Sequence, residues 1–246
     1  MKINAVNRVN LQYNRVILKV SGEILGGRDQ FTSSYLERIA IHLADALEKG
    51  AELLLVIGGG NILRGAEESL LSKLFPPLVC DQIGMLGTVM NGLLLASYLD
   101  QYGLKVRHFS KGILQGVTEV YSPSRADQSL KEGEVVIFSG GTGYAGVSTD
   151  TVAAFLAVEL GAEILLKASK VPGIYLGYED FKSTGAILNS ISYDEMLEKK
   201  LQVIDLSAVA VCRTSLIPIL VFDFMENFVE KILIRRSIGT LISSFS

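Results

Sequence analysis

Residues 15–22 read RVILKVSG: after Arg15 the run is apolar except for Lys19, and it ends in a serine and a glycine. Because the apolar residues are continuous rather than alternating, we expect a strand over Arg15–Val20 that is buried on both faces, as in a parallel sheet. A lysine just inside the end of such a strand is unusual, since lysine side chains are almost never fully buried unless they are paired. This position therefore predicts a functional charge at Lys19.

Five further apolar runs resemble this strand, and longer segments with helical periodicity separate them. The predicted strands are Glu52–Ile57, Lys105–Phe109, Glu134–Phe138, Glu163–Leu166 and Ile217–Phe222. Between Arg15–Val20 and Glu52–Ile57 we expect a helix that begins with a capping box of Ser34 and Glu37 and stops at Gly50. Ser192 and Glu195 repeat the capping pattern before a second helix. The alternation of strands and helices predicts an α/β fold around a mainly parallel sheet.

Hydrophobic content, net charge and cysteine positions indicate the number of domains, the kind of partner and the compartment. The 246 residues are 49% hydrophobic, so the chain can bury one large core, and we expect a single domain over residues 1–246. The formal charge of −3 gives no broad basic surface, so we expect no nucleic-acid partner. Cys80 and Cys212 lie far apart, outside any CxxC or Cys/His pattern. They favour a reducing cytoplasm over a disulfide framework or a zinc site.

One weakly polar run, Ile83–Leu99, approaches the length of a transmembrane helix. It contains Asn91 and three glycines, and it lies between Asp81 and Asp100. We therefore expect a buried or subunit-contacting helix and no membrane partner. The N-terminus has no apolar segment followed by small residues, so no signal peptide is expected.

Three glycine-containing turns each follow a predicted strand: Lys19–Gly22, Gly58–Arg64 and Ser139–Gly143. In a parallel sheet such turns meet at the carboxyl ends of the strands, where open α/β proteins bind ligands. Glycine lets backbone N–H groups approach phosphate oxygens closely. Together the three turns predict a polyphosphate site.

Acidic residues beside predicted helix starts have two interpretations. Asp81, Asp150 and Asp205 each precede or begin an apolar helical pattern, so each is either an N-cap or a functional carboxylate. No GxxxxGK[ST], HRD or DFG pattern is present, which excludes P-loop and protein-kinase frames. The Gly58 cluster is not GxGxxG and has no acidic residue at the Rossmann spacing, so a dehydrogenase is only a distant alternative. His42 and His108 are expected to be structural, and no protein metal ligand is predicted.

The motifs LKVSGE, VIGGGNILRG, DQIGMLGTVMNG, SGGTG, STDTVAA, LKASKV and VIDLSA occur in the order found in bacterial UMP kinases of the amino acid kinase family. The resemblance runs from Arg15 to Ile242. It implies the amino acid kinase fold, a mainly parallel sheet between two helical layers, with UMP toward the N-terminal half and ATP toward the C-terminal half. It also implies transfer of the γ-phosphoryl group of ATP to UMP, Mg²⁺ bound through the nucleotide phosphates, and a homohexamer.

The resemblance assigns individual roles to matching residues. Catalytic roles fall to two cations and two carboxylates: Lys19, Lys167, Asp150 and Asp205. The implied ATP contacts are Lys19, Val20, Ser21, Gly22, Gly60, Arg64, Ser169, Tyr175 and Tyr178. The implied UMP contacts are Gly59, Arg64, Asp81, Thr142, Gly143 and Thr149. Within that set, the carboxylate of Asp81 is expected to accept hydrogen bonds from the ribose hydroxyls, and the segment 142–149 is expected to read uracil.

The chain departs from the family pattern after LKASKV. Pro172 and Tyr178 stand where the family has acidic residues, within a stretch from Pro172 to Asn189 that predicts a hairpin or a flap over a ligand. Two alternatives remain open at this stage. One is a sibling enzyme that phosphorylates a carboxylate or carbamate, such as an N-acetylglutamate or carbamate kinase; the other is a nucleotide-binding regulator with weakened catalysis.

Overall fold

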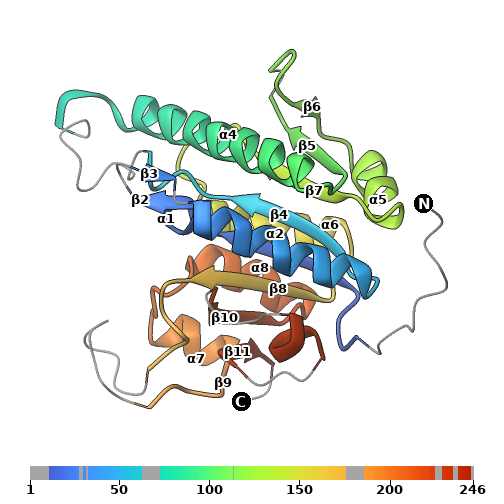
Figure 1. The fold of residues 1–246 in the computed structure, drawn as a ribbon. Helices are drawn as coiled ribbons and strands as arrows, with labels where there is room; N and C mark the ends of the chain where they lie inside the picture. The colour runs from blue at the N-terminus through green and yellow to red at the C-terminus, as the bar shows by residue number, and fades with distance from the viewer. Residues whose placement is uncertain are drawn as a thin grey trace.

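A computed structural model of the chain describes residues 11–27, 30–31, 33–62, 73–112, 114–175, 186–224, 229–234 and 238–244. These residues form one sheet of nine strands with helices on both faces, and a short separate hairpin (Figure 1). The order of the strands in the sheet is β6-β5-β7-β4-β1-β8-β10-β11-β9.

The strands and helices have the following bounds. The strands are β1 (Arg15–Val20), β2 (Gly26–Gly27), β3 (Gln30–Phe31), β4 (Glu52–Ile57), β5 (Val106–Ser110), β6 (Glu119–Val120), β7 (Val135–Ser139), β8 (Ile164–Ser169), β9 (Ser190–Ser192), β10 (Ile219–Asp223) and β11 (Thr240–Ser243). The α-helices are α1 (Gly22–Leu25), α2 (Ser33–Glu48), α4 (Pro77–Gln101), α5 (Pro123–Lys131), α6 (Thr149–Glu159), α7 (Tyr193–Glu198) and α8 (Leu206–Ser215). A π-helix, η1, spans Val229–Ile234.

The sheet is mainly parallel, as predicted. β1 lies at its centre and pairs in parallel with β4 and β8, while β11 runs antiparallel to β10. The six predicted strands are all present; β1 and β4 have the predicted bounds, and the others shift by one to three residues at an end. The largest shift is in β8, which continues through Lys167 to Ser169 because this segment pairs with β10. The short strands β6, β9 and β11 were not predicted.

Side chains of β1 divide between two hydrophobic cores. Val16, Leu18 and Val20 pack with α2, α4 and η1, on one face of the sheet. Ile17 packs with α5, α6, α7 and α8 on the other face. Burial on both faces is thus confirmed, and the alternation along the strand places Lys19 on the same face as Ile17.

Capping agrees with the prediction for one helix and differs for the other. Ser192 caps α7, since its Oγ accepts a hydrogen bond from the Glu195 N–H at 3.1 Å. The capping box at Ser34 was wrong in position: α2 begins at Ser33, so Ser34 lies inside the first turn. Gly50 follows α2 with a φ of +90°, which a glycine adopts without strain.

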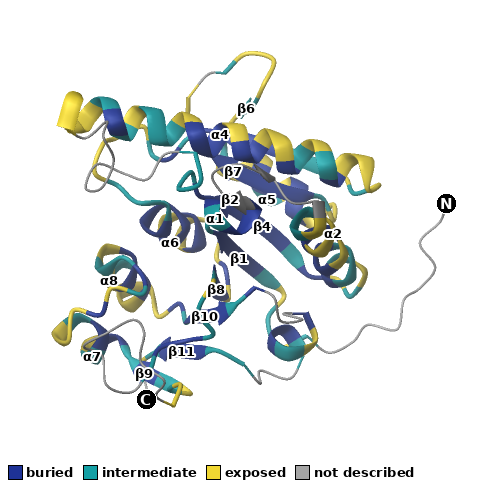
Figure 2. Cartoon of the chain, turned by 60° about the vertical axis from the view of Figure 1, so that its left-hand side comes forward, coloured by how far each residue is buried: buried dark blue, intermediate teal, exposed yellow. Residues whose placement is uncertain are grey.

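Helix α4 is longer than predicted and has two different faces. Its inner face packs on the sheet, where Asn91 is fully buried. On its outer face Leu86, Met90 and Leu93 are exposed by 54%, 55% and 45% (Figure 2). By length and composition alone this helix could cross a membrane. The packed inner face agrees with the expectation of a buried or subunit-contacting helix.

His108 of β5 is buried between α4 and β7. Its Nε2 lies 2.7 Å from Ser139 Oγ, and a Cβ on Gly92 would come within 2.5 Å of the same nitrogen. The packing therefore requires glycine on the helix. Burial lowers the pKa of His108 to about 4, so the folded protein holds this imidazole neutral at physiological pH.

We predict that His108 makes the protein less stable in mild acid. The depressed pKa contributes stability above the unfolded pKa of about 6.5, and this contribution is lost as the pH falls toward 4. Between about pH 7.5 and pH 5 the free energy of unfolding should drop by about 2 kcal/mol from this residue. Urea unfolding of wild type and His108→Gln, which cannot titrate, measures the difference. Equal pH dependence in both proteins would contradict the prediction.

Candidate active site

Two lysines lie side by side at the centre of the sheet. Lys19 of β1 and Lys167 of β8 are direct neighbours in the parallel register. Both side chains are largely buried, with 11% and 13% of their surface exposed. Like charges in adjacent register positions repel, so this pair needs a compensating charge.

Asp150, in the first turn of α6, supplies that charge. Its Oδ1 lies 3.0 Å from the Lys19 ammonium, and its Oδ2 accepts a hydrogen bond from Lys167. Burial alone would raise the pKa of Asp150, but the charges of Lys19 and Lys167 outweigh it and hold this pKa well below its usual value. Burial lowers the pKa of Lys167, and Asp150 opposes that shift. The carboxylate is thus ionised and shared by both ammonium groups.

Asp205 joins this cluster from α8. Its Oδ1 caps the helix by accepting the Ser207 N–H at 3.2 Å, so the N-cap interpretation is confirmed. Its own backbone N–H donates to Asp150 Oδ2 at 3.2 Å. Its Oδ2 accepts from the hydroxyls of Ser148 at 2.6 Å and Thr151 at 3.0 Å. Asp150 itself is not an N-cap, because Ser148 caps α6.

The first two glycine turns pack against each other next to the lysines. A Cβ on Gly22 would lie 2.7 Å from the Gly58 carbonyl oxygen and 2.8 Å from the Gly60 nitrogen. Asn91 of α4 fixes the second turn by donating to the same Gly58 carbonyl at 2.7 Å. A Cβ on Gly58 would likewise lie 2.8 Å from the Gly22 nitrogen, so the close approach of the two turns requires glycine at both Gly22 and Gly58.

The third turn runs from Ser139 into α6, and we call its segment 140–148 the acceptor loop. Gly140, Gly141, Gly143 and Gly146 all have positive φ, which favours glycine at each position. Asp81 holds this loop: its Oδ2 accepts the Gly146 N–H at 2.7 Å. Asp81 lies within α4 rather than at its start, so the N-cap interpretation of this residue was wrong.

The other predicted site residues fall into three groups. Val20, Ser21, Gly22, Gly59 and Gly60 lie in the first two turns, and Thr142, Gly143 and Thr149 lie in or directly after the acceptor loop. Ser169 ends β8, and Tyr175 forms an antiparallel bridge with Ile187, which agrees with the predicted hairpin. Arg64 and Tyr178 lie outside the described residues.

Sequence reasoning missed three residues that order this region: Ser148, Thr151 and Asn91. A serine before the apolar run VAAFLAV was an available signal for the cap at Ser148. Among the described residues, no group of three or more His, Cys, Asp or Glu could hold a metal ion. His42 lies within α2 and His108 within β5, outside the cluster.

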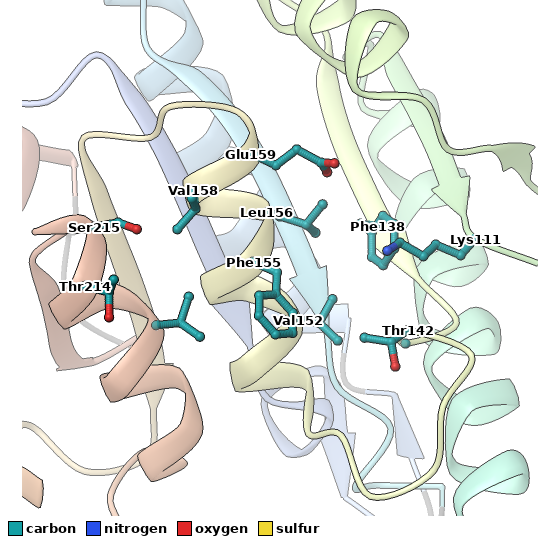
Figure 3. A pocket seen from close by; sticks show the side chains of 12 residues that line it. Lys111, Phe138, Thr142, Val152, Phe155, Leu156, Val158, Glu159, Thr214 and Ser215 are labelled. Carbon is teal, nitrogen blue, oxygen red and sulfur yellow. The ribbon is translucent and has the colours of Figure 1, made fainter.

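A cavity of about 500 Å³ lies on the outer side of α6, between this helix, α8 and the end of β7 (Figure 3). Its wall is mostly apolar and includes Phe138, Val152, Phe155 and Val211. Lys19, Asp150 and Lys167 do not line it, although Thr142 of the acceptor loop does. The ion cluster and this cavity are therefore separate features.

The chain is similar to known proteins over nearly its whole length. A profile of the amino acid kinase family matches residues 14–223. A uridylate kinase from Alcanivorax borkumensis is 38% identical over 237 residues, which cover 95% of this chain and 93% of that protein. One from Bacteroides thetaiotaomicron is 36% identical over 94% of this chain and 98% of its own. The crystal structure of UMP kinase from Bacillus anthracis has a TM-score of 0.88 at 31% identity, over 95% of this chain and 97% of that one.

We predict that Asp150→Asn destabilises the protein strongly. An amide leaves Lys19 and Lys167 adjacent and buried without a counter-charge, and removal of one partner from a buried ion pair typically costs about 3–5 kcal/mol. Urea unfolding at neutral pH measures the loss. Asp127→Asn is the matched control, because Asp127 also pairs with two cations, Arg15 and Lys131, but at the surface. The prediction fails if both variants lose the same stability.

Proposed function

The chain belongs to the amino acid kinase family, and from this premise we propose that it transfers the γ-phosphoryl group of ATP to UMP, giving ADP and UDP. The observation that carries the proposal is the cluster of Lys19, Asp150 and Lys167 beside three glycine turns at the carboxyl ends of parallel strands. The names of the similar proteins and structures supply the substrates.

The cluster suits phosphoryl transfer because this reaction depends on positioning and on stabilising charge. A phosphate oxygen of UMP attacks the γ-phosphorus of ATP, and the bond from that phosphorus to the β–γ bridging oxygen breaks. Lys19 and Lys167 stabilise the negative charge on the group in transfer, while backbone N–H groups of the glycine turns bind its oxygens. The acceptor phosphate is already anionic, so no general base is needed. Asp150 holds both lysines in place and keeps them charged.

We propose that Mg²⁺ binds through the phosphates of ATP rather than in a protein cage. When bound, the ion neutralises charge on the phosphates. We assign Asp205 to positioning rather than to the metal, because its Oδ1 caps α8 and its Oδ2 accepts from Ser148 and Thr151.

On the acceptor side, we propose that Asp81 both orders the acceptor loop and binds the ribose hydroxyls of UMP. A carboxylate can accept several hydrogen bonds, so the bond from the Gly146 N–H is compatible with a further donor. Gly59, Thr142, Gly143 and Thr149 would complete the UMP site, and Ser169 and Tyr175 would lie on the ATP side. Arg64 and Tyr178 keep the roles assigned by resemblance, as phosphate and nucleotide contacts.

We further propose that one domain carries the whole activity, in the cytoplasm, and that the protein assembles into homo-oligomers through α4. The outer face of this helix exposes Leu86, Met90, Leu93 and Leu94 by more than two fifths each (Figure 2). Contiguous apolar surface of this kind is typical of protein interfaces. A second copy of the chain is its proposed partner, and resemblance to bacterial UMP kinases favours a hexamer.

We predict that Leu86→Asp shifts the protein toward smaller species, because a buried unpaired carboxylate opposes association. Leu216→Asp is the control, since Leu216 is 70% exposed after α8, far from the α4 surface in sequence. Size-exclusion chromatography with light scattering measures both masses. An unchanged mass for Leu86→Asp, or an equal shift for Leu216→Asp, would place the interface elsewhere.

The function is tested by ADP release with ATP and a panel of acceptors: UMP, CMP, dTMP, N-acetylglutamate and carbamate. We predict that UMP is the preferred acceptor and that Lys19→Ala folds but loses on the order of 10²–10³ in turnover. Preference for acetylglutamate or carbamate would indicate a carboxylate or carbamate kinase instead. Nucleotide binding without turnover in wild type would indicate a regulator. Turnover of Lys19→Ala near that of wild type would remove this lysine from the mechanism.

A further inference from the structure

The start of α6 and the start of α8 are joined through one carboxylate. Ser148 Oγ and Thr151 Oγ1 both donate to Asp205 Oδ2, at 2.6 Å and 3.0 Å. Thr151 is 5% exposed, and Ser148 also accepts the Thr151 backbone N–H at 3.2 Å. We call these two side chains the hydroxyl clamp. They lie 57 and 54 residues before Asp205 in the chain, so the clamp is a tertiary contact.

Three facts indicate that the clamp does more than cap a helix. The cap of α6 needs only the bond from the Thr151 N–H to Ser148 Oγ, which leaves the Thr151 hydroxyl unnecessary for capping. That hydroxyl instead points to Asp205. Asp205 in turn donates its backbone N–H to Asp150 Oδ2, the same oxygen that binds Lys167. A single residue, Asp205, therefore connects the clamp to the carboxylate that holds both lysines: its side chain accepts from the clamp and its backbone N–H donates to Asp150.

The pKa of Asp205 is lowered in part by the hydrogen bonds of the clamp. Burial raises the pKa of Asp205, and the neighbouring charge of Asp150 acts in the same direction. The hydrogen bonds from Ser148, Ser207 and Thr151 outweigh both effects, so the pKa lies below its usual value. Without the hydroxyls, the Asp205 carboxylate would keep the bond from the Ser207 N–H but lose those from Ser148 and Thr151, while its burial and the nearby charge of Asp150 remained.

We propose that Ser148 and Thr151 are positioning residues for phosphoryl transfer, which act through Asp205 to set the position of Asp150 and thereby of the Lys19 and Lys167 ammonium groups. The inference rests on the proposed function and deepens it. A small displacement of charges that stabilise the transferring group lowers the rate of the chemical step. A change at Thr151 alone leaves the side chains of Asp81 and of the loop residues 140–148 unaltered, together with the hydrogen bond between Asp81 and Gly146. The expected signature is a loss in kcat with little change in KM for UMP.

The decisive variant is Thr151→Val, which replaces the hydroxyl by a methyl group of similar size. We expect kcat to fall roughly ten- to hundred-fold, with KM for UMP within about a factor of two. Thr151→Ser keeps the hydroxyl and should restore most of the rate. Thr214→Val is the matched control, because the Thr214 hydroxyl bonds only a helix carbonyl, that of Ala210. It should leave kcat unchanged.

Ser148→Ala removes a cap as well as a clamp hydroxyl, so its control is Ser192→Ala at the equivalent cap of α7. Both variants should melt at lower temperature, but only Ser148→Ala should lose kcat. The route through Asp205 is tested by a double-mutant cycle: in an Asp205→Ala background, Thr151→Val should cause no further loss. Full additivity of the two losses would overturn the route.

A readout without turnover separates this inference from the proposed function. The side-chain ammonium NMR signals of Lys19 and Lys167 should shift in Thr151→Val and return in Thr151→Ser, while Thr214→Val leaves them unchanged. If wild type does not phosphorylate UMP, the proposed function fails, and these signals still decide whether the clamp positions the cluster. If UMP is phosphorylated but Thr151→Val keeps both the wild-type kcat and the wild-type lysine signals, the clamp proposal is overturned and the function stands.

Discussion

The structure depends on one electrostatic constraint: two ammonium groups, those of Lys19 and Lys167, are buried in adjacent positions of a parallel sheet. Neighbouring strands lie about 5 Å apart, so the register holds the two buried side chains close together on the same face of the sheet. A single shared carboxylate, Asp150, makes the arrangement stable. The start of α6 must therefore lie directly over β1 and β8, and this requirement fixes how the helical layer meets the sheet.

The position of Asp150 also constrains the loop before α6 and the start of α8. The acceptor loop ends where α6 begins, so the loop is anchored at one end by the ion cluster and near its middle by Asp81 of α4. The helix α8 is tied to the same point through Asp205. Because α4 covers one face of the sheet and α6 the other, the loop links the two helical layers across the carboxyl ends of the strands (Figure 1). The contact with Asp81 and the ion cluster around Asp150 are thus joined by one short segment.

The sequence predicted the strands, the glycine turns and Lys19, because each is a local anomaly: a continuous apolar run, a residue without Cβ, or a charge among apolar neighbours. It could not decide between the two interpretations of Asp81 and Asp150, since an acidic residue near a helix start looks the same whether it caps or pairs. The clamp at Ser148 and Thr151 was missed because its partner is more than fifty residues away. The strand β9 was missed because it depends on pairing with β11, near the end of the chain.

Helix α4 connects the acceptor site with the outer surface of the protein. Asp81 lies about one turn from its start, Asn91 fixes its middle to the Gly58 turn, and Leu86 and Met90 lie on the exposed side between and beside them. A continuous helix of 25 residues transmits displacement along its axis because its backbone hydrogen bonds resist stretching. Any partner that covers the apolar face therefore contacts the same rigid element that positions Asp81 and the acceptor loop. Such a partner would also be connected to the lysine cluster, because the loop 140–148 runs from its contact with Asp81 to the start of α6, where Asp150 lies.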